Sequence, residues 1–374
     1  MKKHPPARAR RNNEQEFDPE IMKKIAMLTG GGDCPGLNAV IRAVTRKALV
    51  EGYEVLGFRN GWAGVLKGDY FPLTRERVSG ILHLGGTILG TSRTNPTDEQ
   101  LDTLVKHLKG MDLAALVAIG GDDTLSVASR LHKRGLPVIG VPKTIDNDID
   151  GTDQTFGYDT AINIAAEALD RLHSTAESHS RVLVVELMGR QAGWIALGAG
   201  MAGGADLILL PEFSMSLADI CKIIKQRQAG GKNFSIVAVA EGFKLEGAEV
   251  VSGKNLDAFG HVRLGGIGEM LCREIEKLTG IESRGVVLGH IQRGGTPSAF
   301  DRVLGTRYGV KAVDLAIKGE FGKMVALRGT DVVGIDLDSV ITEVIDKKTG
   351  KPKLRVRNRC VPQELYDVAK VFFG

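Results

Sequence analysis

Two short polar motifs follow neighbouring apolar runs in the middle of the chain, and they restrict the possible folds more than any other feature. The run at 113–119 leads into GGDDT at 120–124, and the run at 136–141 leads into PKTIDND at 142–148. Residues 125–133, between them, have the apolar spacing of a helix. This order predicts a strand–helix–strand unit with both motifs at the carboxyl edge of a parallel sheet, where open α/β sheets bind ligands.

The residue types in these motifs are those that phosphoryl transfer requires. The paired glycines let a phosphate approach the backbone, and the helix predicted to start near Thr124 directs free N–H groups at an anion. Asp122 is placed to hold Mg²⁺, Asp146 to accept a hydroxyl proton, and Lys143 to neutralise the transferred group. Helix caps and simple turns would also use such residues, but two adjacent motifs favour a functional site.

The rest of the chain repeats the strand–helix alternation. Apolar runs at 181–187 and 234–240 predict further buried strands, a run at 332–340 predicts a returning strand, and 37–50 predicts a helix. Alternation of this kind indicates parallel sheets with helices on both faces. At 374 residues, the chain is long enough for two domains with substantial cores.

Charge and cysteine content exclude several classes of function. A net charge of +4 is too small to indicate nucleic-acid binding, and part of it comes from a basic leader at 1–13. The leader contains no apolar segment, so we expect neither a signal peptide nor a membrane anchor. Four scattered cysteines without C-x-x-C spacing favour a reducing compartment over a zinc site. We therefore expect a cytoplasmic protein without nucleic-acid or membrane partners.

Further motifs occur along the chain in a definite order. They are GGDCPGLN at 31–38, MGR at 188–190, AEG at 240–242 and GHIQRGG at 289–295. Together with the two motifs above they resemble the 6-phosphofructokinase family, over most of the chain from about Lys24 onward. Paired glycines with one Asp would be weaker evidence, because NAD kinases and lipid kinases carry a similar motif.

The resemblance implies an α/β fold of two Rossmann-like domains with mainly parallel sheets flanked by helices. We expect a disordered basic leader at 1–20. A phosphoryl-donor domain would comprise 21–157 plus about 292–335. A fructose 6-phosphate domain would comprise 158–291 plus about 336–374.

Two positions bear on the phosphoryl donor. ATP-using members of the family typically have Gly where Asp123 stands, and many have Gly where Lys143 stands, so this chain resembles the pyrophosphate-dependent branch. A second carboxylate at Asp123 would repel and obstruct a nucleotide, whereas Lys143 adds positive charge for a small, dense anion. Because some ATP-using relatives also have the lysine, Asp123 is the discriminating residue. An Asp123 side chain turned to solvent or capping the helix would leave ATP binding intact.

The resemblance also implies residue roles in a reversible, glycolytic transfer from pyrophosphate to the 1-hydroxyl of fructose 6-phosphate. The catalytic residues would be Asp146 as proton acceptor, Lys143, Asp123 and Arg190. The donor would be bound by Gly31, Arg93, Gly121, Asp122, Asp123, Thr124 and Lys143, with Mg²⁺ at Asp122. The sugar phosphate would be bound by Thr144, Ile145, Asp146, Arg181, Met188, Gly189, Arg190, Glu241, Arg284, His290 and Arg293.

Arginine forks suit phosphate oxygens, although a single arginine more often forms a surface ion pair. The resemblance implies that Arg181 and Arg284 reach the neighbouring subunit's site in a homodimer or homotetramer. His290 fits a core position as well as a ligand contact.

Three alternatives remain. The chain could be an ATP-dependent phosphofructokinase, it could use another phosphosugar such as a seven-carbon one, or it could be a non-catalytic nucleotide- or phosphosugar-sensing homologue. Retention of Asp122, Asp146 and Asp148 argues against the last, because a binding protein needs no base beside a metal carboxylate.

Overall fold

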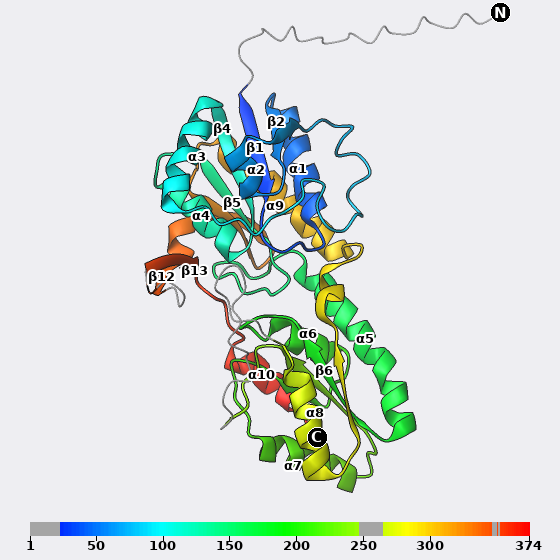
Figure 1. The fold of residues 1–374 in the computed structure, drawn as a ribbon. Helices are drawn as coiled ribbons and strands as arrows, with labels where there is room; N and C mark the ends of the chain where they lie inside the picture. The colour runs from blue at the N-terminus through cyan, green and yellow to red at the C-terminus, as the bar shows by residue number, and fades with distance from the viewer. Residues whose placement is uncertain (1–22, 247–264, 346–349, 351) are drawn as a thin grey trace, which may run out of the picture.

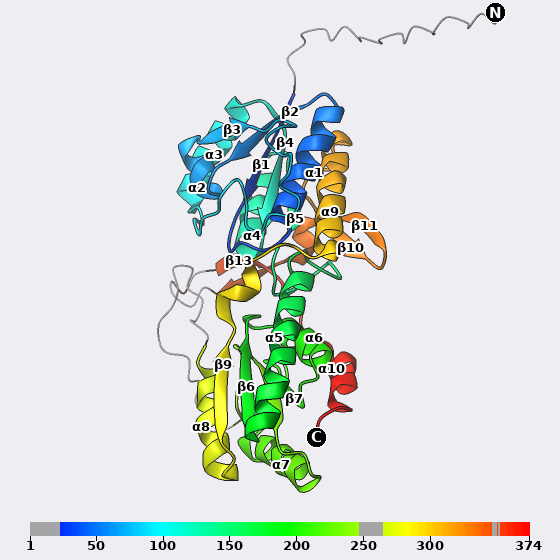
Figure 2. The same cartoon turned by 90° about the vertical axis from the view of Figure 1, so that its right-hand side faces the viewer.

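The chain folds into two α/β halves that lie one beyond the other (Figures 1 and 2). The structure is a computed structural model that describes residues 23–246, 265–345, 350 and 352–374. These residues form a seven-stranded sheet, a four-stranded sheet and a two-stranded hairpin. The expected fold class is confirmed, and the expected leader at 1–20 lies outside the described residues.

The first half is built on the seven-stranded sheet, whose strand order is β11-β10-β5-β4-β1-β2-β3. The inner strands pair in parallel, and β3 and β11 pair antiparallel at the two edges. Central strands are apolar along their whole length because both faces of the sheet are covered by helices. The strands are β1 (Lys24–Thr29), β2 (Glu54–Phe58), β3 (Tyr70–Pro72), β4 (Leu113–Gly120), β5 (Val138–Pro142), β10 (Lys323–Arg328) and β11 (Asp331–Asp336).

Helices cover both faces of this sheet, and the residues of β1 alternate between the two cores that result. Ile25 and Met27 lie in the core with α1 and α9, whereas Ala26 and Leu28 face the core under α2, α3 and α4. Successive strand residues point to opposite faces, so a continuous apolar run fills both cores. These helices are α1 (Leu37–Val50), α2 (Trp62–Lys67), α3 (Asp98–Gly110), α4 (Asp122–His132) and α9 (Ala299–Ile317).

The second half is built on an all-parallel sheet of order β7-β8-β6-β9. Its helices α5 and α6 share a core with one face, and α7 and α8 share a core with the other. The elements are α5 (Tyr158–His179), β6 (Val182–Leu187), α6 (Trp194–Ala202), β7 (Leu207–Leu209), α7 (Leu217–Ala229), β8 (Ser235–Ala240), α8 (Ile267–Thr279), β9 (Ser283–Val287), the 3₁₀ helix η1 (Gly289–Arg293) and α10 (Gln363–Lys370). In the described part of the chain, no helix is both long and apolar enough to cross a bilayer.

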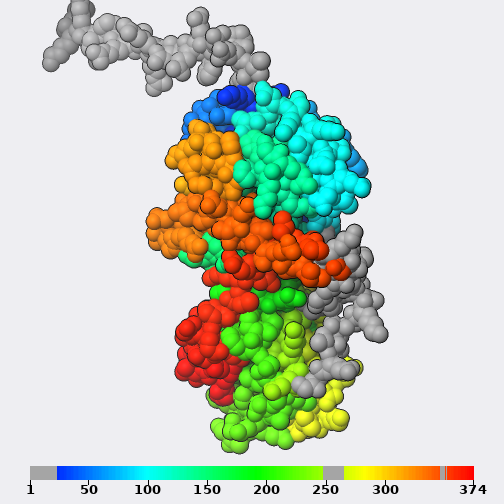
Figure 3. Space-filling model, turned by 90° about the vertical axis from the view of Figure 1, so that its left-hand side faces the viewer, coloured from blue at the N-terminus to red at the C-terminus, as the bar shows by residue number. Residues whose placement is uncertain are grey.

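A short hairpin follows the first sheet and lies at the junction of the halves. After the 3₁₀ helix η2 (Leu337–Val340), β12 (Ile341–Ile345) pairs antiparallel with β13 (Pro352–Val356), and β13 packs against α4. Leu337, Val340 and Val356 are buried in the core under α4, which explains this position. The expectation for 336–374 differs from this arrangement, because only the segment after the hairpin packs on the second half. Figure 3 shows this orange-to-red part of the chain as a band across the junction.

Candidate active site

Two glycine loops meet at the carboxyl edge of the first sheet, because β1 and β4 are neighbours. The first glycine loop follows β1 at 30–36, and the second lies at the end of β4, at 120–121. Thr124 is buried between the loops: a Cβ added at Gly30 would lie 2.5 Å from Thr124 Oγ1, and one at Gly120 would lie 2.4 Å from the same atom. Both glycines are therefore needed for the loops to close on Thr124. Gly31 has a φ of +79°, and its N–H donates to Ser92 O at 3.2 Å. A phosphate would use Gly31 for its lack of a side chain rather than for that N–H.

Asp122 and Asp123 form the first turn of α4, where the helix dipole stabilises negative charge. Asp122 Oδ1 accepts from Val356 N at 2.7 Å, and Arg355 Nε lies 3.8 Å from Asp122 Oδ2. Asp123 Oδ1 accepts from Asn95 Nδ2 at 3.3 Å and lies 3.3 Å from Lys353 Nζ. The Asp123 side chain is 19% exposed, so it is not turned to solvent.

Lys353 and Arg355 were not predicted from the sequence. The signal for them was available in KPKLRVR at 351–357, where basic residues alternate with apolar ones as on one face of a strand.

Lys143 lies between the two glycine loops. It is 3% exposed, its ammonium donates to Gly32 O, and a Cβ added at Gly31 would lie 3.5 Å from its Nζ. Burial lowers the pKa of Lys143 to about 8. The lysine therefore sits where an anion approaching the first glycine loop would meet it.

Asp146 faces the second half of the molecule. Its side chain is 4% exposed, Oδ2 lies 3.9 Å from Arg190 Nε, and its backbone N–H donates to Thr144 Oγ1 at 3.1 Å. Asp146 Oδ1 is buried without a hydrogen-bond partner among the described residues. A buried carboxylate oxygen without a partner is costly in an isolated protein, so it suits a group that receives a substrate hydroxyl. Thr144 and Ile145 are buried beside it.

Carboxylates are concentrated at this edge. Burial raises the pKa of Asp148 to about 7, repulsion from Asp146 and Asp122 adds to the effect, and the Arg190 cation opposes it. Within the described ranges, no group of three or more His, Cys, Asp or Glu side chains is arranged to hold a metal ion. A metal at Asp122 would therefore take its other ligands from phosphate oxygens and water, which is how Mg²⁺ is commonly held beside phosphates.

Arg190 approaches from the end of β6. Burial opposes its charge, but Asp146, Asp148 and the α4 aspartates outweigh that effect and raise its pKa. Its backbone has a φ of +53°, and its N–H donates to Glu241 Oε1 at 2.9 Å. Burial raises the pKa of Glu241, which lies directly after β8. The motifs MGR and AEG thus form one unit.

Next to this unit, Met188 and Gly189 form part of the wall of the candidate site. Met188 N donates to Gln292 Oε1 at 3.3 Å, and Gly189 has a φ of +142°. Gln292 is fully buried and was not among the predicted site residues, although it lies inside the predicted motif GHIQRGG. It ties η1 to the end of β6.

Arg293 reaches back from η1 to the first glycine loop. Arg293 Nη1 donates to Asp33 O at 3.3 Å and would lie 2.7 Å from a Cβ added at Gly32. His290 is exposed in the same 3₁₀ helix, which is not the core position considered for it.

The structure does not bring Arg181 and Arg284 to this site within one chain. They lie at the amino ends of β6 and β9, where Arg181 Nε and Arg284 Nη2 donate to Glu282 at 2.7 and 2.5 Å. The site residues of the second half lie at or beyond the carboxyl ends of these strands. Arg93 lies exposed in the loop whose Thr91 Oγ1 donates to Gly31 O at 2.5 Å.

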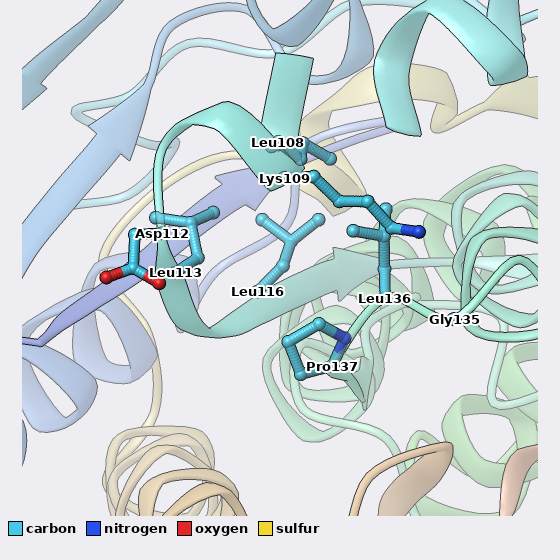
Figure 4. A pocket seen from close by; sticks show the side chains of 8 residues that line it. All are labelled: Leu108, Lys109, Asp112, Leu113, Leu116, Gly135, Leu136 and Pro137. Atoms are coloured by element: carbon cyan, nitrogen blue, oxygen red, sulfur yellow. The ribbon is translucent and has the colours of Figure 1, made fainter. Parts of the chain in front are cut away.

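A separate cavity of about 190 Å³ lies at the opposite edge of the first sheet (Figure 4). It is lined by Leu108, Lys109, Asp112, Leu113, Leu116, Gly135, Leu136 and Pro137. These residues flank the amino ends of β4 and β5 and include none of the predicted site residues. The chemistry described above therefore belongs to the carboxyl edge.

Comparisons with known proteins agree with this geometry. The family model described as Phosphofructokinase matches residues 24–316. A pyrophosphate–fructose 6-phosphate 1-phosphotransferase of Streptomyces coelicolor is 53% identical over 94% of this chain and 100% of its own length. An ATP-dependent 6-phosphofructokinase 2 of the same organism is 52% identical over 86% of this chain and 95% of its own. The phosphofructokinase structure from Saccharomyces cerevisiae superposes with a TM-score of 0.74 at 30% identity, covering 85% of this chain and 44% of that one. The chain belongs to the phosphofructokinase family.

Proposed function

We propose that this enzyme transfers a phosphoryl group from pyrophosphate to the 1-hydroxyl of fructose 6-phosphate, giving fructose 1,6-bisphosphate and phosphate. The Streptomyces relative named for this reaction is matched along its whole length. The reaction is reversible, because the phosphoryl-transfer free energy of pyrophosphate does not greatly exceed that of the product. It belongs to glycolysis.

The position of Asp123 is the observation that carries the donor assignment. Its carboxylate is held between Asn95 and Lys353 at the start of α4, beside the paired glycines. An anion fixed there opposes further phosphates of a nucleotide by repulsion and bulk. The remaining space suits a small anion and is lined by Lys143, Gly31, Gly121 and Thr124. Arg93 adds positive charge from the loop that contains Thr91.

The acceptor side supports proton abstraction by Asp146. Its Oδ1, which has no hydrogen-bond partner in the part of the chain that the structure describes, accepts the proton of the sugar 1-hydroxyl as that oxygen attacks the near phosphorus. Arg190, beside Oδ2, stabilises the charge of the transferred group. Thr144, Ile145, Met188, Gly189, Glu241, His290 and Arg293 bind the sugar phosphate.

The residues present fit Mg²⁺ at Asp122. The Asp122 carboxylate lies next to a phosphate-binding loop, which matches the preference of Mg²⁺ for carboxylate, phosphate and water oxygens. When bound, the ion would offset charge on the donor and orient it. Asp122 keeps its carboxylate in place for this through the N–H of Val356.

An oligomer with shared sites accounts for Arg181 and Arg284. Both lie far from their own chain's Arg190, at the other end of the second sheet, and β9 is an exposed edge strand. Val287 at the end of β9 and Ile291 in η1 add exposed apolar side chains to this surface. We assign these arginines to the partner subunit's sugar-phosphate site in a homodimer or homotetramer.

The state of the cysteines supports a cytoplasmic location. All four are free thiols, and three of them are buried. Free thiols persist in reducing compartments, so we assign the protein to the cytoplasm.

The test is paired kinetics with pyrophosphate and ATP on this chain and on Asp123→Gly. We expect the unaltered enzyme to turn over with pyrophosphate and Mg²⁺, and Asp123→Gly to lose about 10²-fold in kcat/KM for pyrophosphate while gaining with ATP. ATP supporting comparable turnover in the unaltered enzyme would overturn the donor assignment in favour of the ATP-dependent function of the 52% identical relative. Absence of turnover with both donors would instead indicate a sensing homologue.

A further inference from the structure

One continuous segment near the carboxyl end contacts both active-site motifs. We call residues 352–361 the C-terminal strap. At its start, Val356 N donates to Asp122 Oδ1 at 2.7 Å, Lys353 Nζ lies 3.3 Å from Asp123 Oδ1, and Arg355 Nε lies 3.8 Å from Asp122 Oδ2. The donor-side aspartates are therefore both held by this segment.

The strap then runs along the loop that follows Asp146. Arg359 N donates to Asp148 O at 2.8 Å, Asp150 N donates to Arg357 O at 3.1 Å, and Ile149 forms an antiparallel bridge with Asn358. This pairing places the strap beside the acceptor motif.

Farther along, the strap is attached to the second half. Trp194 Nε1 donates to Arg359 O at 2.8 Å, and Val361 N donates to Glu212 Oε1 at 3.0 Å. Its path is thus fixed at both ends and in the middle, and the Lys353 and Arg355 side chains are positioned by a well-anchored backbone.

The charges of the strap suit an anion at the α4 start. Lys353 and Arg355 are two residues apart on a strand, so they share one face. Their side chains are 22% and 26% exposed, which leaves both partly reachable from solvent. The pairs that they form with Asp123 and Asp122 are long, at 3.3 and 3.8 Å, so neither has the close geometry of a strong ion pair.

Pyrophosphate arriving beside Asp122 and Asp123 would add several negative charges where two carboxylates already lie. Lys143 offsets charge from the side of the first glycine loop. Lys353 and Arg355 lie at the other side, at the α4 carboxylates themselves. Cations on both sides are the arrangement that binds a dense anion without excess repulsion.

We propose that the C-terminal strap forms the outer wall of the phosphoryl-donor site and that Lys353 and Arg355 bind the donor's phosphate oxygens. This proposal rests on the proposed function for the identity of the donor. It also assigns Asp123 a second task, which is to hold Lys353 at the wall. The strap thus makes the donor site depend on residues more than two hundred positions beyond the motif.

Lys353→Met and Arg355→Met test the proposal, because methionine keeps much of the length and removes the charge. We expect each to raise the KM for pyrophosphate by about tenfold, which corresponds to about 1.4 kcal/mol, while the KM for fructose 6-phosphate stays within about twofold. Lys353→Arg should retain most of the donor affinity. Titration calorimetry with methylenediphosphonate and Mg²⁺, without sugar, should show the same loss of affinity in the absence of turnover.

Lys133→Met is the matched control. Lys133 follows the other end of α4 and lies 3.2 Å from Asp338 Oδ2, with 49% and 53% of the two side chains exposed. The Lys133→Met variant removes a Lys–Asp ion pair at the far end of α4 without touching the site, so both KM values should stay unchanged.

Two outcomes overturn the proposal. One is a KM for pyrophosphate in Lys353→Met and Arg355→Met within about twofold of the unaltered enzyme. The other is an equal rise of both KM values together with a lower melting temperature, which would make the strap purely structural. If the unaltered enzyme uses ATP instead, the proposed function fails, and the same variants then test the wall through the KM for ATP.

Discussion

Arg190 Nε lies 3.9 Å from Asp146 Oδ2, and this pair joins the carboxyl ends of two sheets that share no strand. Asp146 follows β5 in the first half, and Arg190 follows β6 in the second. A carboxylate and a cation side by side at this junction suit the proposed attack by a hydroxyl on a phosphoryl group. The site therefore depends on the relative placement of the two halves.

Asp146→Asn should abolish turnover. The amide keeps the shape of the carboxylate but cannot accept the hydroxyl proton, so we expect kcat to fall by about 10³-fold or more. Binding of fructose 6-phosphate, measured by calorimetry, should change little. A variant with near-normal kcat would remove Asp146 from the role of base.

Arg190→Met should reduce kcat by about 10²-fold with smaller changes in both KM values, because the lost charge acts mainly on the transferring group. Steady-state kinetics with both substrates varied would measure this. Arg190→Lys serves as the comparison and should recover part of kcat, since it restores the charge but not the planar fork. A loss confined to the KM for fructose 6-phosphate would instead make Arg190 a sugar-binding residue only.

The fold was predictable wherever apolar runs are long. The helix predicted at 37–50 coincides with α1, and the runs at 181–187 and 234–240 correspond to β6 and β8. The strand predicted at 332–340 is only partly correct: β11 ends at Asp336, and the chain turns through η2 so that Leu337 and Val340 enter the core. The local apolar pattern predicts the strand, but it does not predict the tertiary contact that ends the strand.

The candidate site was predictable in its motifs but not in its walls. Asp146 and Arg190 come from two predicted motifs and lie 3.9 Å apart, and their roles stay predictions. Lys353 and Arg355 were not predicted, because the alternation of basic and apolar residues around β13 is short and the place of this five-residue strand depends on packing against α4. Gln292 was not predicted as a site residue, because a glutamine in a sequence rarely indicates a buried role. Its amide oxygen nevertheless links η1 to Met188.

The pKa of Lys143 predicts a pH dependence. Burial lowers this pKa to about 8, so the ammonium loses its proton as the pH rises through that value, and the positive charge proposed to meet the donor is lost. We expect kcat/KM for pyrophosphate to fall above pH 8. Lys143→Arg stays protonated and should lack this descending limb, whatever its absolute rate. Because ionisation of pyrophosphate itself affects both enzymes equally, identical profiles would show that Lys143 does not cause the limb.

Gly309→Ala should destabilise the first half. A Cβ at Gly309 would lie 2.7 Å from Ala43 Cβ and 2.8 Å from Val40 O, so α9 could not keep its approach to α1. Overpacking of this kind costs about 1–3 kcal/mol in the free energy of unfolding, which exceeds the gain in helix propensity from replacing glycine. Urea denaturation followed by circular dichroism would measure the change. Gly110→Ala is the matched control, because a Cβ there meets nothing within 4 Å at the end of α3, and it should leave stability equal or slightly higher. Equal midpoints for the two variants would mean that the α1–α9 contact adjusts without strain.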